Sequence, residues 1–134
     1  MAGSREQKLL QEFGLTELDP TELPLDHPYV RRRIIFSART KDELLEVLRS
    51  SNYYVLTGIM PSSERIHLGT MAVIESVKCF AERARFTVLL VADLESLATR
   101  NISLKDGKKI ALEYHIPTYL ALGIDPERTV FYFQ

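Results

Sequence analysis

The sequence predicts an α/β fold, a partial Rossmann-like parallel sheet of order βαβαβ with an N-terminal helical lead-in. Three apolar runs rich in β-branched and aromatic residues predict strands at Tyr53–Ile59, Phe86–Ala92 and Thr129–Phe133. Segments with helical spacing of apolar residues separate these runs. Strands separated by helices pair in parallel through right-handed crossovers. We therefore expect one mononucleotide-binding half of a doubly wound sheet.

The lead-in is expected to cover residues 1–50 as an N-terminal helical extension. Its first helix begins at Ser4–Gln7 and ends near Gly14, because glycine is the usual residue after a helix end. Thr16–Asp26 contains two prolines and predicts an irregular connection. Thr40 and Glu43 form a capping-box pattern that starts a second helix. The apolar face of that helix consists of Leu44, Leu45 and Leu48.

Residues 51–134 are expected to form the nucleotide-binding half itself. Its first helix should run from His67 to Ala84, with inward residues Leu68, Met71, Ile74, Val77 and Ala81. The nearly continuous apolar run Phe86–Ala92 is typical of a strand covered on both faces. The capping-box pattern Ser103–Asp106 predicts a further helix, which should continue to Leu122–Gly123 with a bend at Pro117. We expect that helix to have His115 on its surface and the inward residues Ile110, Ala111, Tyr114 and Ala121.

The composition excludes several classes of function. With 46% hydrophobic and 26% charged residues, the chain is typical of a globular protein. The balance of 17 Lys+Arg against 18 Asp+Glu argues against a binder that holds nucleic acid by charge alone. Cys79 is the single cysteine, so we expect no internal disulfide and no metal site, and we interpret it as a packing residue. The start of the chain has no apolar signal core and the longest apolar run is too short for a membrane span, so we expect a cytoplasmic protein without a membrane partner.

The informative motif is Thr57–Thr70, which joins the end of the first strand to the start of a helix. Ligands bind at such junctions in open α/β sheets, and the free N–H groups at a helix start favour an anion. Gly58 would let a ligand approach the backbone, and Gly69 would let one lie close over the first helical turn. His67 could donate a hydrogen bond to a phosphate oxygen, or could simply cap the helix.

The order of residues in this motif, Pro-Ser-Ser-Glu-Arg-Ile-His-Leu-Gly, resembles the signature of class I aminoacyl-tRNA synthetases, in particular the tyrosine/tryptophan branch. Further segments are similar to tryptophanyl-type sequences of archaea and eukaryotes, and together they cover nearly the whole chain. They are Arg32–Ser37, Val91–Arg100, Glu113–Pro126 and Phe131–Gln134.

The resemblance implies a tryptophan–tRNA ligase type of protein that activates an amino acid with ATP and charges tRNA. It implies ATP with accompanying Mg²⁺, an aromatic amino acid with tryptophan ahead of tyrosine, and tRNA as partners. It assigns His67 as the catalytic residue, and assigns ATP binding to Gly58, Pro61, Ser62, Ser63, His67, Gly69 and Thr70. The amino acid would lie near Leu56, Thr57 and Asp93, with the Asp93 carboxylate facing the substrate ammonium. An equal alternative for Asp93 is that it caps the next helix.

Several departures favour a second hypothesis, a non-catalytic paralogue that binds ATP or an amino acid, or completes another chain. Thr70 replaces the second His or Asn of the family signature, and Ser63 replaces its glycine. Leu56 stands where an aromatic residue often lines the amino-acid pocket. The family's Lys-Met-Ser-Lys-Ser loop, the second half of its fold and its anticodon-binding domain are not in this sequence, so the resemblance implies a truncated or partial catalytic domain.

Two surface features complete the expectations. Arg31–Arg33 is interpreted as a solvated patch, with a tRNA phosphate contact as the alternative. The strand Tyr53–Ile59 carries no Lys or Pro and would be an exposed sheet edge. We therefore expect a homo-oligomer, or a second chain that completes the sheet.

Overall fold

The computed structural model describes residues 4–134 and divides the chain into two compact units, Met1–Tyr53 and Tyr54–Gln134. Among the described residues, no helix combines the length and the apolar character that a membrane crossing requires.

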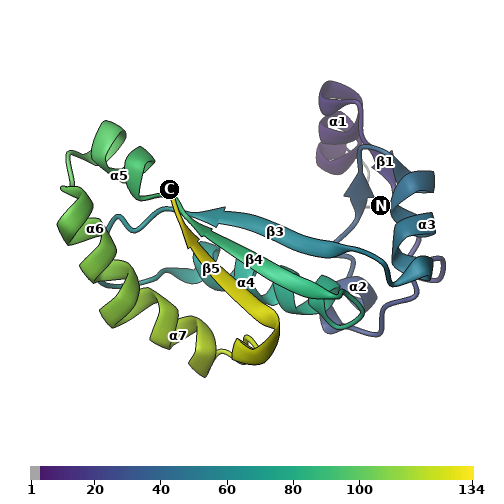
Figure 1. Ribbon diagram of the computed structural model, residues 1–134. Helices are drawn as coiled ribbons and strands as arrows, with labels where there is room; N and C mark the ends of the chain where they lie inside the picture. The colour runs from purple at the N-terminus through teal and green to yellow at the C-terminus, as the bar shows by residue number, and fades with distance from the viewer. Residues whose placement is uncertain (1–3) are drawn as a thin grey trace. The chain divides into compact units, whose positions relative to one another are not determined.

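Residues 4–53 of the first unit contain three helices and a small antiparallel sheet (Figure 1). The helices are α1 (Ser4–Phe13), α2 (Pro28–Arg31) and α3 (Lys41–Ser50), and the strands are β1 (Thr16–Glu17) and β2 (Ser37–Ala38). Gly14, with a φ of 60°, ends α1 in the left-handed region as predicted. The buried residues Leu18, Leu23, Leu25, Val30, Leu45 and Leu48 form the core of this unit.

Three expectations for this unit change. The irregular connection contains β1, and α2 and β2 had no predicted counterpart. Thr40 occupies the N-cap of α3 but its side chain makes no cap hydrogen bond, so the predicted capping box is not formed.

Within the arginine run, Arg31 pairs with Asp26 and Arg33 with Glu17, both on the exposed surface. Such pairs fit the interpretation of a solvated patch.

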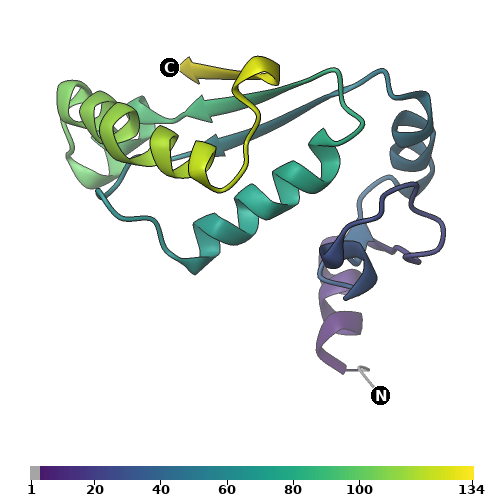
Figure 2. The same cartoon turned by 90° about the horizontal axis from the view of Figure 1, so that it is seen from below.

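The second unit is a three-stranded parallel sheet of order β3-β4-β5, which confirms the predicted fold class. Its strands are β3 (Tyr54–Ile59), β4 (Phe86–Val91) and β5 (Thr129–Phe133), and the crossover from β3 to β4 is α4 (Leu68–Ala81). The longer crossover to β5 contains α5 (Asp93–Arg100), α6 (Leu104–Ile110), the π-helical turn η1 (Ala111–His115), α7 (Ile116–Ala121) and the 3₁₀ turn η2 (Pro126–Arg128). Helices α4 and α7 lie on the same side of the sheet (Figure 2).

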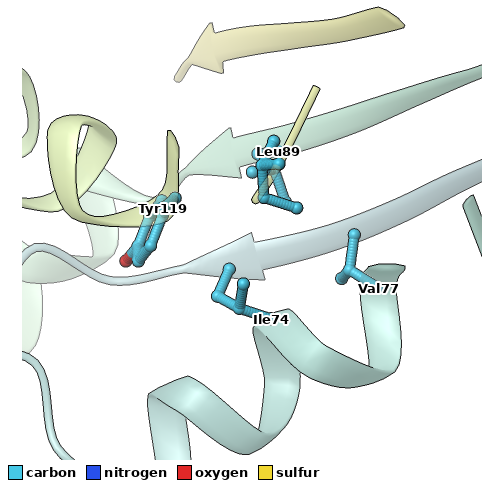
Figure 3. Close-up of a cluster of buried hydrophobic side chains, with 5 residues drawn as sticks. Ile74, Val77, Leu89 and Tyr119 are labelled. Atoms are coloured by element: carbon cyan, nitrogen blue, oxygen red, sulfur yellow. The ribbon is translucent and has the colours of Figure 1, made fainter. Parts of the chain in front are cut away.

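The core of this unit lies between that side of the sheet and these two helices. Figure 3 shows Ile74 and Val77 of α4 pointing toward Leu89 of β4, with Tyr119 of α7 beside them. The prediction that Ile74 and Val77 face inward is confirmed. Leu68 and Met71 are exposed instead, and neither belongs to the buried cluster between α4 and the sheet.

The other face of the sheet is largely uncovered, so the prediction that β4 is covered on both faces is wrong. Along β4, Thr87, Leu89 and Val91 are buried while Phe86 is exposed, which is the alternation of a strand packed on one side. The rings of Tyr54 and Phe86 stack on the uncovered face with centroids 5.2 Å apart. The exposed apolar side chains of this face are Tyr54, Leu56, Phe86, Val130 and Tyr132.

The predicted long helix from Ser103 to Gly123 is interrupted by the π turn, and this reverses one inward assignment. Pro117 has no N–H to donate to the carbonyl four residues earlier, and the N–H of Ile116 bonds to Ala111 five residues back. The wider turn rotates the helix, so that His115 is buried while Tyr114 and Ala121 are exposed, contrary to expectation. The predicted cap is confirmed, since Ser103 Oγ accepts the N–H of Asp106 at 3.1 Å.

Candidate functional site

A cavity of about 290 Å³ opens at the carboxyl end of β3, where the sequence motif crosses from strand to helix. Helices α5 and α6 lie beyond this end of the strands (Figures 1 and 2). The cavity is lined by the end of β3, the following loop, the first turns of α4, and single residues of α5 and η1. These residues are Gly58, Ile59, Met60, Ser62, Ser63, Arg65, Ile66, His67, Gly69, Thr70, Val73, Arg100 and His115.

His67 is the N-cap residue of α4, in an extended conformation with φ −114° and ψ 171°. Its Nδ1 accepts the backbone N–H of Thr70 at 3.3 Å. Because an accepting nitrogen carries no proton, the neutral ring has its proton on Nε2. The side chain therefore caps the helix with one nitrogen and offers a donor with the other. Both interpretations of His67 are compatible in one geometry.

Gly69 has a structural role within the chain itself, and the expected close approach of a ligand to it stays a prediction. A Cβ atom at this position would lie 3.0 Å from Cε1 and Nδ1 of His67, so the missing side chain makes room for the capping ring. At Gly58 a Cβ would meet only Leu90 Cδ2 at 4.0 Å, so no protein atom requires glycine there. The close approach of a ligand to Gly58 stays a prediction.

The loop between β3 and α4 is held mainly by its own backbone and by neighbouring helices. Pro61 is buried, does not line the cavity, and its carbonyl accepts the hydroxyl of Ser96 at 2.8 Å. The hydroxyl of Ser63 donates to the carbonyl of Arg65 at 2.7 Å, within the loop. Ser62 and Ser63 are exposed and line the cavity, and their contact with ATP stays a prediction.

Among the cavity residues that were not predicted as site residues, three carry polar or charged side chains: Arg65, Arg100 and His115. Arg100 was missed because Val91–Arg100 was not identified as a helix that ends at the cavity, and His115 because it was placed on the surface. No Asp or Glu belongs to the described residues that line this cavity. With two guanidinium groups, a ring N–H and the start of α4, its chemistry suits an anion. Within residues 4–134, no group of three His, Cys, Asp or Glu side chains could hold a metal ion.

The predicted amino-acid residues Leu56, Thr57 and Asp93 do not line this cavity. Leu56 projects from the uncovered face of the sheet, and Thr57 has the opposite orientation, on the side of the core. Asp93 is buried, and its Oδ1 accepts the N–H groups of Leu94 and Gln134, each at 3.2 Å. It is not the N-cap of α5, which is Ala92, and its hydrogen bond to Gln134 ties the end of β5 to the end of β4.

The parallel sheet and this strand-to-helix junction agree with the class I aminoacyl-tRNA synthetases, and comparison with known families shows the same class. Residues 49–134 match the family described as tRNA synthetases class I (W and Y), and the chain belongs to this family. Within it the chain is similar to archaeal tryptophan–tRNA ligases. It is 36% identical over 129 residues to that of Thermoplasma acidophilum and 37% identical over 135 residues to that of Aeropyrum pernix. These matches cover 96% and 95% of this chain, and 29% and 36% of the respective relatives.

Solved structures give the same result. The chain superimposes on the tryptophanyl-tRNA synthetase of Aeropyrum pernix K1 with a TM-score of 0.82 and 32% identity, over 96% of this chain and 37% of that one. The enzyme from Plasmodium falciparum gives a TM-score of 0.84 and 26% identity, over 97% of this chain and 38% of that one. The resemblance predicted from the sequence is confirmed, and the chain spans 29% to 38% of the length of these relatives.

Proposed function

We propose that this chain supplies the ATP-binding part of a tryptophan–tRNA ligase, in which ATP activates the amino acid before transfer to tRNA. The observation that carries the proposal is the cavity at the end of β3, which combines the free Nε2–H of His67 with Arg65 and Arg100 and is lined by no described carboxylate. The relatives named above are described as tryptophan–tRNA ligases, which supports tryptophan as the amino acid.

The proposed reaction begins when a carboxylate oxygen of the amino acid attacks the α-phosphorus of ATP. The bond between this phosphorus and the bridging oxygen to the β-phosphate breaks, and pyrophosphate leaves with that oxygen. No protein nucleophile is required, so the contribution of the chain is to position the phosphates and neutralise their charge. His67 and the N–H groups near Gly69 and Thr70 would contact the phosphate oxygens, with Ser62 and Ser63 beside them. Mg²⁺ would be held by the phosphates, because the cavity offers donors and cations rather than carboxylates.

The amino-acid site is proposed around Leu56, Thr57 and Asp93. Leu56 and Thr57 belong to β3, and Asp93 follows the neighbouring strand β4 at its carboxyl end. The cavity lies at the carboxyl end of β3. tRNA, a second copy of the chain or a completing second chain are the proposed macromolecular partners. The relative from Arabidopsis thaliana is described as cytoplasmic, and we propose the same compartment here.

ATP–pyrophosphate exchange with each amino acid, followed on this chain, tests the activity. Exchange that depends on tryptophan supports the proposal. ATP binding without exchange for any amino acid would support the non-catalytic alternative. No observation in the structure favours that alternative. A thermal-shift series of amino acids in the presence of ATP tests the substrate. Stabilisation by aliphatic or acidic amino acids alone would exclude an aromatic substrate.

A further inference from the structure

His115 connects the long crossover of the second unit to the loop that precedes α4. Its Nε2 lies 2.6 Å from the carbonyl oxygen of Ser63, a residue 52 positions earlier in the chain. The ring is 5% exposed and reaches the loop from the last residue of the π turn. A π turn inside a helix is rare and is often found at functional sites. Here it gives a buried imidazole to a cavity that is otherwise lined mainly by the loop and α4.

The hydrogen bonds determine which nitrogen of His115 carries the proton. A carbonyl oxygen only accepts, so Nε2 must donate to Ser63. In the neutral ring Nδ1 is then an acceptor, and the hydroxyl of Tyr119 lies 3.2 Å from it as a donor. Burial raises the pKa of Tyr119 well above its usual range, which keeps that hydroxyl protonated. The hydroxyl of Tyr119 therefore donates to the imidazole of His115, and the imidazole donates to the loop.

The loop carries this constraint onward to the cavity. Ser63, whose carbonyl is held by His115, donates its own hydroxyl to the carbonyl of Arg65. Arg65 lines the cavity, and His67, two residues further, caps α4. The hydrogen bond from His115 to Ser63 thus constrains the loop backbone from which Arg65 and His67 project.

We propose that His115 is a positioning residue of the anion-binding cavity, holding the loop from Met60 to Ile66 through its hydrogen bond to the Ser63 carbonyl. The inference rests on the proposed ATP function for the ligand of the cavity. The tether, meaning the hydrogen bond from His115 to the Ser63 carbonyl, is a property of the chain without ligand. His115 acts through the loop backbone and does not need to touch the phosphates.

The test compares His115→Phe, which keeps a ring but has no donor, with His115→Gln, whose amide can donate at a similar reach. Tyr114→Phe is the matched control, because Tyr114 is the neighbouring residue on the exposed side of the same turn. ATP affinity is measured by calorimetry, and amide hydrogen exchange of residues 62–66 is measured without ATP. For His115→Phe we expect a loss of ATP affinity of roughly 5- to 10-fold and faster loop exchange, as for the loss of one partly buried hydrogen bond. His115→Gln should recover both within about 2-fold, and the control should change neither.

Unchanged loop exchange in His115→Phe would overturn the proposal, as would equal impairment by Phe and Gln, which would indicate packing rather than donation. If His115→Phe does not fold, Tyr119→Phe decides, since loss of the hydroxyl that orients the ring should also speed loop exchange. If the wild-type chain binds no ATP, the proposed function fails, whereas faster loop exchange in Phe but not in Gln still establishes the tether.

Discussion

The ring of His67 lies directly over Gly69, so that a Cβ atom on Gly69 would be 3.0 Å from both Cε1 and Nδ1 of the ring. This contact explains why a glycine stands two residues after His67 at the start of α4. The ring folds back over the first turn to accept the Thr70 N–H at Nδ1, which leaves Nε2–H as its donor in the neutral ring. Capping and the proposed binding of ATP therefore depend on the same ring orientation.

Gly69→Ala tests this relationship. The added methyl group should displace the ring from Thr70, and loss of the cap should lower the free energy of unfolding by about 1 kcal/mol. The higher helix propensity of Ala should raise the free energy of unfolding by roughly 0.5–1 kcal/mol. The free energy of unfolding should therefore change little, while ATP affinity falls roughly 3- to 10-fold because the donor is misplaced. Denaturant unfolding and calorimetry measure the two quantities. Unchanged ATP affinity would show that the ring orientation is irrelevant to binding.

His67→Ala should weaken ATP binding by about 1.5–3 kcal/mol, the worth of one hydrogen bond to a charged group. His67→Asn separates the two roles, because Asn at an N-cap still accepts the Thr70 N–H but does not present the Nε2–H. We expect Asn to retain the unfolding free energy that Ala loses, while both variants lose ATP affinity. Calorimetry that gives equal ATP affinity for wild type and Ala would remove His67 from the site.

Much of this arrangement follows from the sequence, and the remainder has physical causes that local patterns do not contain. The strands, their parallel order and the His67 loop were predictable, because apolar runs and the signature are local. His115 was not, since its burial results from a π turn that shifts the helical register by a fraction of a turn. Arg100 reaches the cavity only through the packing of α5, which no sequence spacing encodes.

Asp93 can be assigned to a structural or a substrate-binding role by two substitutions. Asp93→Asn keeps an oxygen that can accept from Leu94 and Gln134, so it should lose less than about 1 kcal/mol of unfolding free energy. Asp93→Ala should lose about 1–3 kcal/mol, because two partly buried N–H groups would be left without this acceptor. If the carboxylate also binds the substrate ammonium, Asn should abolish the thermal shift by tryptophan despite its retained stability. A tryptophan response equal to wild type would leave only the structural role.

Cys79 provides a pH-dependent prediction. It is fully buried, and burial, with a smaller contribution from Glu82, raises its pKa from 9.0 to about 11. The pKa of this thiol is higher in the folded state than in the unfolded state. Its contribution to the free energy of unfolding is therefore fully present below the unfolded pKa and is lost as the pH rises through the folded pKa. Between pH 8 and pH 11 the wild type should therefore lose roughly 2–3 kcal/mol more unfolding free energy than Cys79→Ala. Parallel loss in both proteins would show that the thiol ionises normally.

The final prediction concerns the outer side of β3. Within residues 54–134 this strand pairs only with β4, and its exposed side chains Tyr54 and Leu56 continue the uncovered apolar face. An unpaired strand edge beside an apolar face favours association with another chain. We expect self-association at micromolar concentration, and we expect Leu56→Lys to reduce it, because the charge would be placed on the exposed side of the strand.

The choice of position decides whether this experiment is interpretable. Val55 packs against the buried cluster, so a lysine there would disrupt the core, whereas Leu56 is 58% exposed and tolerates a charge. Leu94→Lys is the matched control, since Leu94 is a similarly exposed leucine of α5, outside the sheet. Sedimentation velocity should show a smaller weight-average sedimentation coefficient for Leu56→Lys only, with amide exchange along β3 becoming faster as the chains separate. A wild-type chain that sediments as a compact monomer at high micromolar concentration, with β3 amides already exchanging freely, would rule out association through this strand.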